Sequence, residues 1–195
     1  HAVDPLESTE ALQQDVRRRY GLGDDRLVVW VGTMEPRKNL ITLVRAFDQV
    51  SGVHSDVRLV LIGPTGWGNA GEEIRALAES NGSRIVLAGA CSDPDRDALI
   101  ATASVFAFPS LHEGFGLPVL EAMQLGTAVI ASDIPALREV ASGAAVHVPA
   151  TDVDGWGSAL SDLLAHEDRR SVLEHDGEIV AASRRWDAVA DGTHQ

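Results

Sequence analysis

The 195-residue sequence predicts an α/β fold in which a parallel sheet is covered by helices on both faces. Short apolar runs rich in β-branched residues alternate with longer amphipathic stretches along the chain. Runs such as RLVVWVG, VRLVLIG and SVFAFPS are apolar without alternation, as strands buried on both faces require. The regular strand and helix order indicates the same class.

The expected elements follow one another in a Rossmann-like order. The predicted strands span residues 27–31, 58–62, 85–88, 105–108, 128–131 and 145–148. The predicted helices span residues 40–51, 72–80, 93–103, 118–125, 134–141 and 154–166. We expect residues 1–23 to form an entry segment with a short helix, and residues 167–195 to form one or two further helices.

Several predicted strands end in Gly or Pro-Ser, where the chain must turn at the carboxyl edge of the sheet. Open α/β sheets bind their ligands at this edge. The segments that follow the strands are therefore the first places to search for a binding site.

Composition excludes several classes of partner. The chain has 16 basic and 29 acidic residues and a net charge of -13, spread along the sequence, so no basic face for nucleic acid is expected. Cys91 is the single cysteine, which excludes an internal disulfide framework and a thiolate metal site. The seven histidines show no metal-ligand spacing, so no metal is expected.

No apolar run reaches the roughly 18 residues of a membrane-spanning helix, and residues 1–10 lack a signal-peptide pattern. We therefore expect a soluble, cytoplasmic protein that meets a membrane surface only through a region outside this sequence.

The segment FPSLHEGFGLPVLEAMQLG, residues 108–126, joins a strand, a glycine-rich loop and a helix. Gly114 and Gly116 let backbone N–H groups approach a ligand closely, and Pro118 suits the first helical position. The amino end of such a helix attracts anions, so a diphosphate is the expected ligand.

Two glutamates flank this loop. Glu113 precedes the helix and Glu121 lies one turn inside it, so two carboxylates can accept hydrogen bonds from sugar hydroxyls. The alternative is that Glu121 only complements the helix dipole and Glu113 is a solvated loop acid. The intact loop between them favours the ligand site.

The segment resembles the E-x7-E signature of the retaining family-4 glycosyltransferases, with Glu113 and Glu121 as the paired glutamates. The intervening GFGLPVL and the following AMQLGTAVIASD agree as well. The resemblance implies that Glu113 contacts the transferred hexose, that Glu121 binds the ribose, and that Phe115 and Leu117 lie beside the donor with the two loop glycines. It also implies front-face attack, in which the donor phosphate assists proton removal, rather than double displacement.

A second motif, WVGTMEPRKNL, turns a buried strand through Gly32 and places Arg37 and Lys38 beside the next helix. Two cations there can stabilise a departing nucleoside diphosphate without a metal. The motif resembles the phosphate-binding loop of the same family, which implies diphosphate contacts from Lys38 and Arg37. Many members carry Arg where this chain has Thr33, although a Gly-Thr form recurs in relatives that transfer mannose and similar sugars. The alternative is an exposed basic pair.

Two further turns follow strands. Gly63 and Pro64 lie in LIGPTGWG, and Cys91 lies in LAGACSDPDRDAL. The resemblance implies that the nucleobase lies near Cys91, with side-chain contacts from Asp93 or Arg96. The alternative for Asp93 is an N-cap of the following helix, and Cys91 is expected to be a small apolar wall rather than a nucleophile.

The resemblance covers nearly the whole chain and matches the second of the two domains of a GT-B enzyme. It implies that residues 1–195 form a single Rossmann-like donor-binding domain, the C-terminal half of a GT-B glycosyltransferase, and that an N-terminal acceptor domain lies outside the sequence. The implied donor is GDP-mannose or a related nucleotide-diphosphate sugar, without a cofactor or metal. The implied acceptor is a saccharide or lipid-linked saccharide, and the isolated domain is expected to be inactive.

Other proteins with this fold remain alternatives. The first is a non-catalytic nucleotide-binding module with a regulatory or interaction role, but such a scaffold has no need for Glu113, Lys38 and Glu121 together. A non-hydrolysing epimerase should place its catalytic acids and histidines elsewhere. A glycogen-phosphorylase type should contain a pyridoxal-binding lysine segment, and neither pattern is seen.

Overall fold

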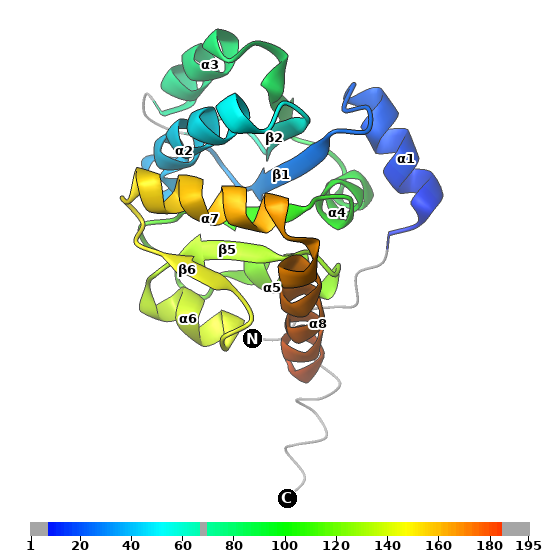
Figure 1. Ribbon diagram of the computed structural model, residues 1–195, viewed down its shortest axis with the longest axis vertical. Helices are drawn as coiled ribbons and strands as arrows, with labels where there is room; N and C mark the ends of the chain where they lie inside the picture. Colours follow the sequence, from blue (N-terminus) through cyan, green and yellow to red (C-terminus); the bar gives the residue numbers. More distant parts are fainter. Residues whose placement is uncertain (1–7, 67–69, 185–195) are drawn as a thin grey trace, which may run out of the picture.

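The computed structural model describes residues 8–66 and 70–184 and confirms the predicted α/β fold (Figure 1). Six parallel strands form one sheet in the order β3-β2-β1-β4-β5-β6. The strands are β1 Arg26–Val31, β2 Val57–Ile62, β3 Ile85–Gly89, β4 Val105–Phe108, β5 Val129–Ser132 and β6 Val146–Val148. Each predicted strand is present, and no strand end differs by more than one residue.

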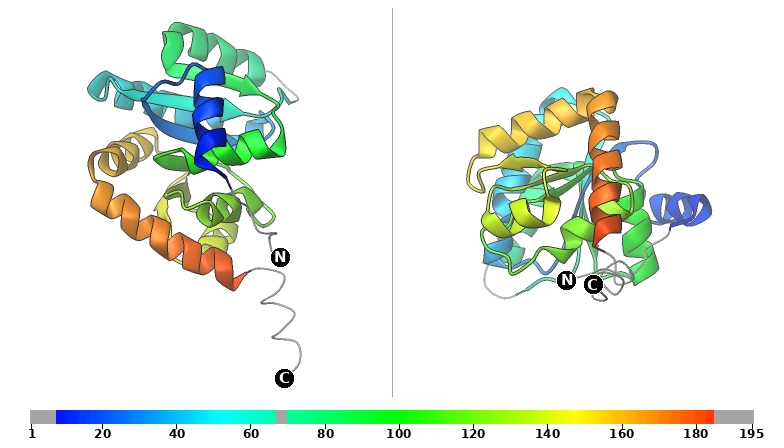
Figure 2. Two further views of the ribbon diagram at one scale, coloured as in Figure 1. Left: turned by 90° about the vertical axis from the view of Figure 1, so that its right-hand side faces the viewer. Right: turned by 90° about the horizontal axis from the view of Figure 1, so that it is seen from below.

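The helices connect the strands in the predicted order. In the described residues they are α1 Glu10–Arg19, α2 Leu40–Val53, α3 Ala70–Ser80, α4 Asp93–Ala101, α5 Leu117–Gln124, α6 Pro135–Ala141, α7 Val153–Ala165 and α8 Glu167–Ser183, with 3-10 turns at Pro36–Lys38 and Gly82–Arg84. Figures 1 and 2 show α2 and α7 on one face of the sheet and α4 and α5 on the other. The helix α8 packs against α5.

The central strands form the core of the molecule. In β1, the four residues from Leu27 to Trp30 are fully buried, and so is every residue of β4. Burial of a Val or Leu side chain contributes roughly 1.5–3 kcal/mol relative to leaving it exposed. The continuous apolar runs thus anchor the middle of the sheet, and the loops at its carboxyl edge start from fixed points.

The helix α4 begins differently from one of our expectations. Asp93 is not the N-cap, because the Ser92 side chain accepts the Asp95 N–H at 3.3 Å and Ser92 has an extended backbone. Asp93 is instead the first residue of the helix, and its side chain is free to bond to Arg96 (3.1 Å). The hydroxyl one position earlier therefore caps the helix.

Glycines allow the loops after β1, β2 and β3 to approach one another. The Gly32 N–H donates to the Ile62 carbonyl at 2.9 Å, and the Gly63 N–H donates to the Gly89 carbonyl at 2.8 Å. Gly63 has a φ of +132°, and a Cβ atom there would overlap the carbonyl oxygen of Gly32. The close approach of these two loops requires glycine at position 63.

We expect Gly63→Ala to lower the free energy of unfolding by about 2–3 kcal/mol or more, because the methyl group meets a backbone oxygen and the φ angle is strained. Denaturant unfolding of the chain measures this value.

The matched control is Gly52→Ala. Gly52 lies in the last turn of α2, has open space around its Cα and does not adopt a left-handed φ. Since alanine favours helix, this change should be neutral or should stabilise by up to about 1 kcal/mol. Equal stabilities of the two variants would contradict the assigned loop contact.

Candidate functional site

The loops after β1, β2 and β3 surround a hollow of about 270 Å³ at the carboxyl edge of the sheet. Seven of its ten lining residues are predicted donor contacts, and the residues come from three separate turns. The lining consists of Val31, Gly32, Thr33, Ile62, Gly63, Pro64, Ala90, Cys91, Asp93 and Arg96. The structure therefore brings seven of the predicted donor contacts together, whereas five others lie outside this lining: Gly114, Phe115, Gly116, Leu117 and Glu121.

An ion pair joins the loop after β1 to the loop after β4. Lys38 Nζ lies 2.6 Å from Glu113 Oε1, and the two side chains are only 9% and 10% exposed. The ammonium also lies 4.9 Å from the centre of the Phe108 ring, a cation–π contact. Breaking such a desolvated pair without a replacement partner is costly, so the pair fixes both loops.

Lys38 is the only lysine of the chain, and the other fifteen basic residues are arginines. Its neighbour Arg37 is 45% exposed and bonds to Glu35 at 2.9 Å and, more loosely, to Glu113 at 3.5 Å. The backbone of Arg37 is fixed as well, because its carbonyl accepts the Leu111 N–H at 2.8 Å. The two predicted cations are thus at the site, with Lys38 buried and Arg37 at the surface.

The helix α5 begins at Leu117, one residue before the predicted start, so Pro118 is its second residue. Gly116 is the N-cap and has a left-handed φ of 91°. A Cβ atom added at this position would lie 2.6 Å from the Leu137 side chain. The Val119 N–H donates to the Gly116 carbonyl at 2.9 Å. Within the described residues, no acceptor is paired with the N–H groups of Gly114, Gly116 and Leu117; Gly114 and Leu117 are exposed, whereas Gly116 is buried.

Two residues of the same loop differ in environment. Phe115 is partly buried and packs against the hydrophobic core, which anchors the loop. The Leu117 side chain is exposed at the tip of the helix. The loop therefore has an apolar side that packs against the core and an exposed side that carries Gly114 and Leu117.

Glu121 lies in a different electrostatic environment from Glu113. Burial raises the pKa of Glu121, Arg96 opposes this effect, and the negative charges of Asp97 and Asp93 add to it. Arg96 is held in turn by Asp97 at 2.8 Å and by Asp93 at 3.1 Å. The two glutamates of the motif thus serve separate ends of the site, Glu113 near Lys38 and Glu121 near Arg96.

Burial also raises the pKa of the Cys91 thiol. A thiol of raised pKa is a poor nucleophile at neutral pH. Its position in the lining of the hollow agrees with the predicted small apolar wall.

Sequence reasoning missed Asn39, which links three loops. It adopts a left-handed backbone with a φ of 55°, and its Nδ2 donates to the carbonyls of Pro109 (3.1 Å) and Ala150 (2.6 Å). Its Oδ1 accepts from the Thr42 hydroxyl at 2.9 Å. Asparagine tolerates this left-handed conformation better than most residues. Its position between Lys38 and the predicted helix start was the feature of the sequence that could have indicated this role.

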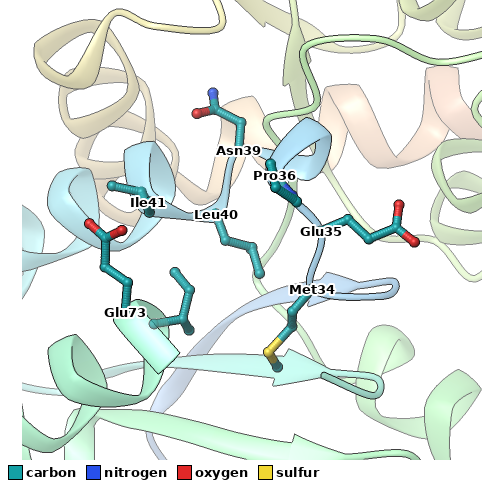
Figure 3. Close-up of a pocket in the computed structure, with 8 residues that line it drawn as sticks. Met34, Glu35, Pro36, Asn39, Leu40, Ile41 and Glu73 are labelled. Atoms are coloured by element: carbon teal, nitrogen blue, oxygen red, sulfur yellow. The ribbon is translucent and has the colours of Figure 1, made fainter. Parts of the chain in front are cut away.

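A second hollow lies beside the loop after β1 that carries Lys38 (Figure 3). In the figure, Met34 and Leu40 point toward its interior, whereas Glu35 and Asn39 point away. Its volume is about 280 Å³, and its lining is Met34, Glu35, Pro36, Asn39, Leu40, Ile41, Glu73 and Ile74. The lining contains two carboxylates and no cation, so it does not suit a diphosphate.

Neither a metal site nor a membrane-spanning helix occurs in residues 8–66 and 70–184. No group of three or more His, Cys, Asp or Glu residues there is arranged to hold a metal ion. No helix in that part of the chain has the length and apolar character needed to cross a membrane.

Comparison with known proteins gives a family match and curated relatives. The sequence profile of the family described as Glycosyl transferases group 1 matches residues 13–179. The O-antigen chain mannosyltransferase B of Escherichia coli is 33% identical over 177 residues, covering 88% of this chain and 45% of that protein. The GDP-mannose-dependent alpha-(1-6)-phosphatidylinositol monomannoside mannosyltransferase of Mycobacterium tuberculosis is 30% identical over 200 residues, covering 96% and 51%. The chain spans about half the length of these curated relatives.

A solved structure shows the same fold. The crystal structure of HepE from Anabaena in complex with UDP and glucose matches 95% of this chain and 52% of that chain, with a TM-score of 0.81 and 16% sequence identity. The predicted Rossmann-like architecture is therefore confirmed by comparison as well as by the strand order.

We expect Glu121→Gln to raise the free energy of unfolding more at pH 8 than at pH 4. Burial raises the pKa of Glu121 in the folded chain above its ordinary value of 4.5. A group with a raised folded pKa contributes stability that is complete below the unfolded pKa and is lost as pH rises through the folded pKa. Urea unfolding of both proteins across this pH range measures the difference.

The control is Glu139→Gln on α6, where the side chain is exposed. Surface substitutions of this kind usually change stability by less than about 0.5 kcal/mol. A Glu121→Gln effect that is independent of pH, or larger at pH 4, would show that burial does not disfavour the charged carboxylate.

Proposed function

The chain belongs to the family of group 1 glycosyl transferases, and we propose that it binds the nucleotide-sugar donor of a glycosyltransferase. One observation carries this proposal. Lys38 and the amides of the exposed residues Gly114 and Leu117 lie on neighbouring loops at the same sheet edge as the hollow of about 270 Å³. A cation and open helix-tip amides are the groups that bind a diphosphate.

In this proposal the donor extends across the carboxyl edge of the sheet. The base enters the hollow lined by Cys91, Asp93 and Arg96, and Glu121 accepts hydrogen bonds from the ribose. The diphosphate lies between Lys38 and the tip of α5, and Glu113 accepts hydrogen bonds from the hexose. The separation of the two glutamates, each with its own cationic neighbour, supports this order of contacts.

The same groups can act in the transfer. As the glycosidic bond breaks, negative charge develops on the departing diphosphate, and Lys38, Arg37 and the helix tip stabilise it in place of a metal ion. We propose that the configuration of the sugar is retained, with the acceptor attacking from the side of the departing phosphate and a phosphate oxygen taking the acceptor proton. This part rests on the resemblance to retaining family-4 enzymes.

The acceptor site is proposed to lie outside this chain. The curated relatives are about twice as long as the matched region. We propose that residues 1–195 are the donor domain of a GT-B enzyme, that an N-terminal domain binds a saccharide or lipid-linked saccharide, and that the donor domain alone does not turn over. A cytoplasmic location, with any membrane contact made by the other domain, completes this proposal.

GDP-mannose is the proposed donor. The relatives are named as mannosyltransferases, one of them GDP-mannose-dependent. Asp93 lines the hollow with a carboxylate that is 83% exposed, and it can accept the two neighbouring N–H groups of a guanine edge. A UDP-sugar is the second candidate, because the HepE structure contains UDP, although the likeness to HepE concerns the fold alone.

We expect the chain to bind GDP more tightly than UDP or ADP, because uracil offers only one ring N–H and adenine offers an acceptor to Asp93. Calorimetry with the three diphosphates measures this order, and a preference for UDP or ADP would remove the guanine assignment.

Lys38→Met should weaken GDP binding by about tenfold or more in the same measurement, since a hydrogen bond to a charged group contributes roughly 1.5–3 kcal/mol.

Arg45→Met is the matched control for Lys38→Met. It removes one exposed positive charge from α2 at a position outside the lining of the donor hollow. GDP affinity should stay within about twofold of the parent chain, because exposed charges interact weakly over distance. Equal losses in the two variants would mean that only net charge matters.

A transfer assay separates an enzyme from a non-catalytic binding module. In the longer protein that joins this chain to an acceptor domain, Glu113→Ala should lower turnover by about a hundredfold or more, as loss of an aligned polar contact in a transition state does. A binding module would show no transfer in the parent protein.

A further inference from the structure

Lys38 has one carboxylate partner among the described residues, and that partner is Glu113. Both side chains are about nine-tenths buried, and the ammonium is also covered by the Phe108 ring. The cation proposed for the diphosphate is therefore neutralised in this structure by the carboxylate proposed for the sugar.

The use of lysine at this position is selective. All fifteen other basic residues of the chain are arginines. An arginine presents a planar fork suited to holding two oxygens of one partner, whereas the lysine ammonium is a compact charge that moves readily between partners. A lysine at this position is therefore suited to leaving Glu113 and binding a phosphate oxygen instead.

We propose that the Lys38–Glu113 ion pair makes the site favour the intact nucleotide sugar over the nucleoside diphosphate that remains after transfer. This inference rests on the proposed function. A diphosphate that recruits Lys38 removes the partner of Glu113 and leaves a nearly buried carboxylate beside new negative charge. An unpaired buried charge of this kind is strongly unfavourable.

The sugar of the intact donor offsets this cost, because its hydroxyls donate hydrogen bonds to Glu113 in place of the ammonium. A nucleoside diphosphate has no hydroxyl at that end, and its terminal phosphate carries additional negative charge. Arg37 replaces Lys38 only in part, since its Nη1 lies 3.5 Å from Glu113 while its Nε bonds to Glu35 at 2.9 Å.

The pair then acts at the end of the catalytic cycle. Once the sugar has left with the acceptor, Lys38 returns to Glu113 and the diphosphate loses its cation. Release of the product limits turnover in many enzymes, so a built-in competitor for the phosphate-binding cation favours turnover.

The test compares the dissociation constants of GDP and GDP-mannose for the chain and for Glu113→Gln by calorimetry. Glutamine keeps the shape of the side chain and removes its charge. We expect the variant to bind GDP about tenfold tighter, and its preference for GDP-mannose over GDP to fall by about tenfold or more. An unchanged ratio would overturn the inference while leaving the donor site in place.

Glu35→Gln is the matched control, because it removes the same charge from the loop that carries Lys38, but its carboxylate bonds to Arg37 and not to Lys38. Its ratio should stay within about twofold of the parent value. A shift as large as that of Glu113→Gln would mean general charge repulsion and would overturn the inference.

A second measurement covers the case in which Glu113→Gln does not fold, as thermal unfolding would reveal. The methyl ester of GDP at its terminal phosphate has the charge of GDP-mannose but lacks the sugar hydroxyls. The parent chain should bind GDP-mannose more tightly than this ester, and equal affinity would contradict the inference. If the parent chain binds none of the three ligands, the proposed function falls and this inference falls with it.

Discussion

The ion pair between Lys38 and Glu113 is the interaction on which the proposed donor site depends. It joins two loops whose residues are 75 positions apart in sequence and fixes both. The Asn39 amide and the hydrogen bond from Leu111 to Arg37 reinforce the same junction. Because the pair is desolvated, a ligand can take one partner only if it satisfies the other.

The fold explains why this junction lies where it does. Parallel strands end at one edge, so the turns after β1 and β4, which are neighbours in the sheet, meet there. Gly32 and Gly63 permit the adjoining turns to touch, and both line the hollow that is proposed for the base. The left-handed Gly116 then starts α5 directly after the loop that carries Glu113.

The sequence predicted the strands to within one residue because their apolar runs are continuous and end at turn residues. Lys38 and Glu113 were each assigned from their own motif, but their contact is tertiary and no local pattern reveals it. Asn39 and Asp97 were missed for the same reason, since the loop carbonyls that Asn39 binds and the buried position of Asp97 beside Glu121 arise only on folding. The helix α5 starts at Leu117, one residue before the predicted start, because Gly116 serves as its N-cap and lies close to Leu137.

The most direct test of the account follows the single lysine by NMR. In chain labelled only at lysine, the Lys38 side chain gives one ammonium signal, which can be observed as GDP is added. The account predicts that this signal shifts and saturates with the dissociation constant found by calorimetry, because the ammonium exchanges Glu113 for a phosphate oxygen. GDP binding that saturates while the Lys38 signal stays unmoved would place the diphosphate elsewhere and contradict the account.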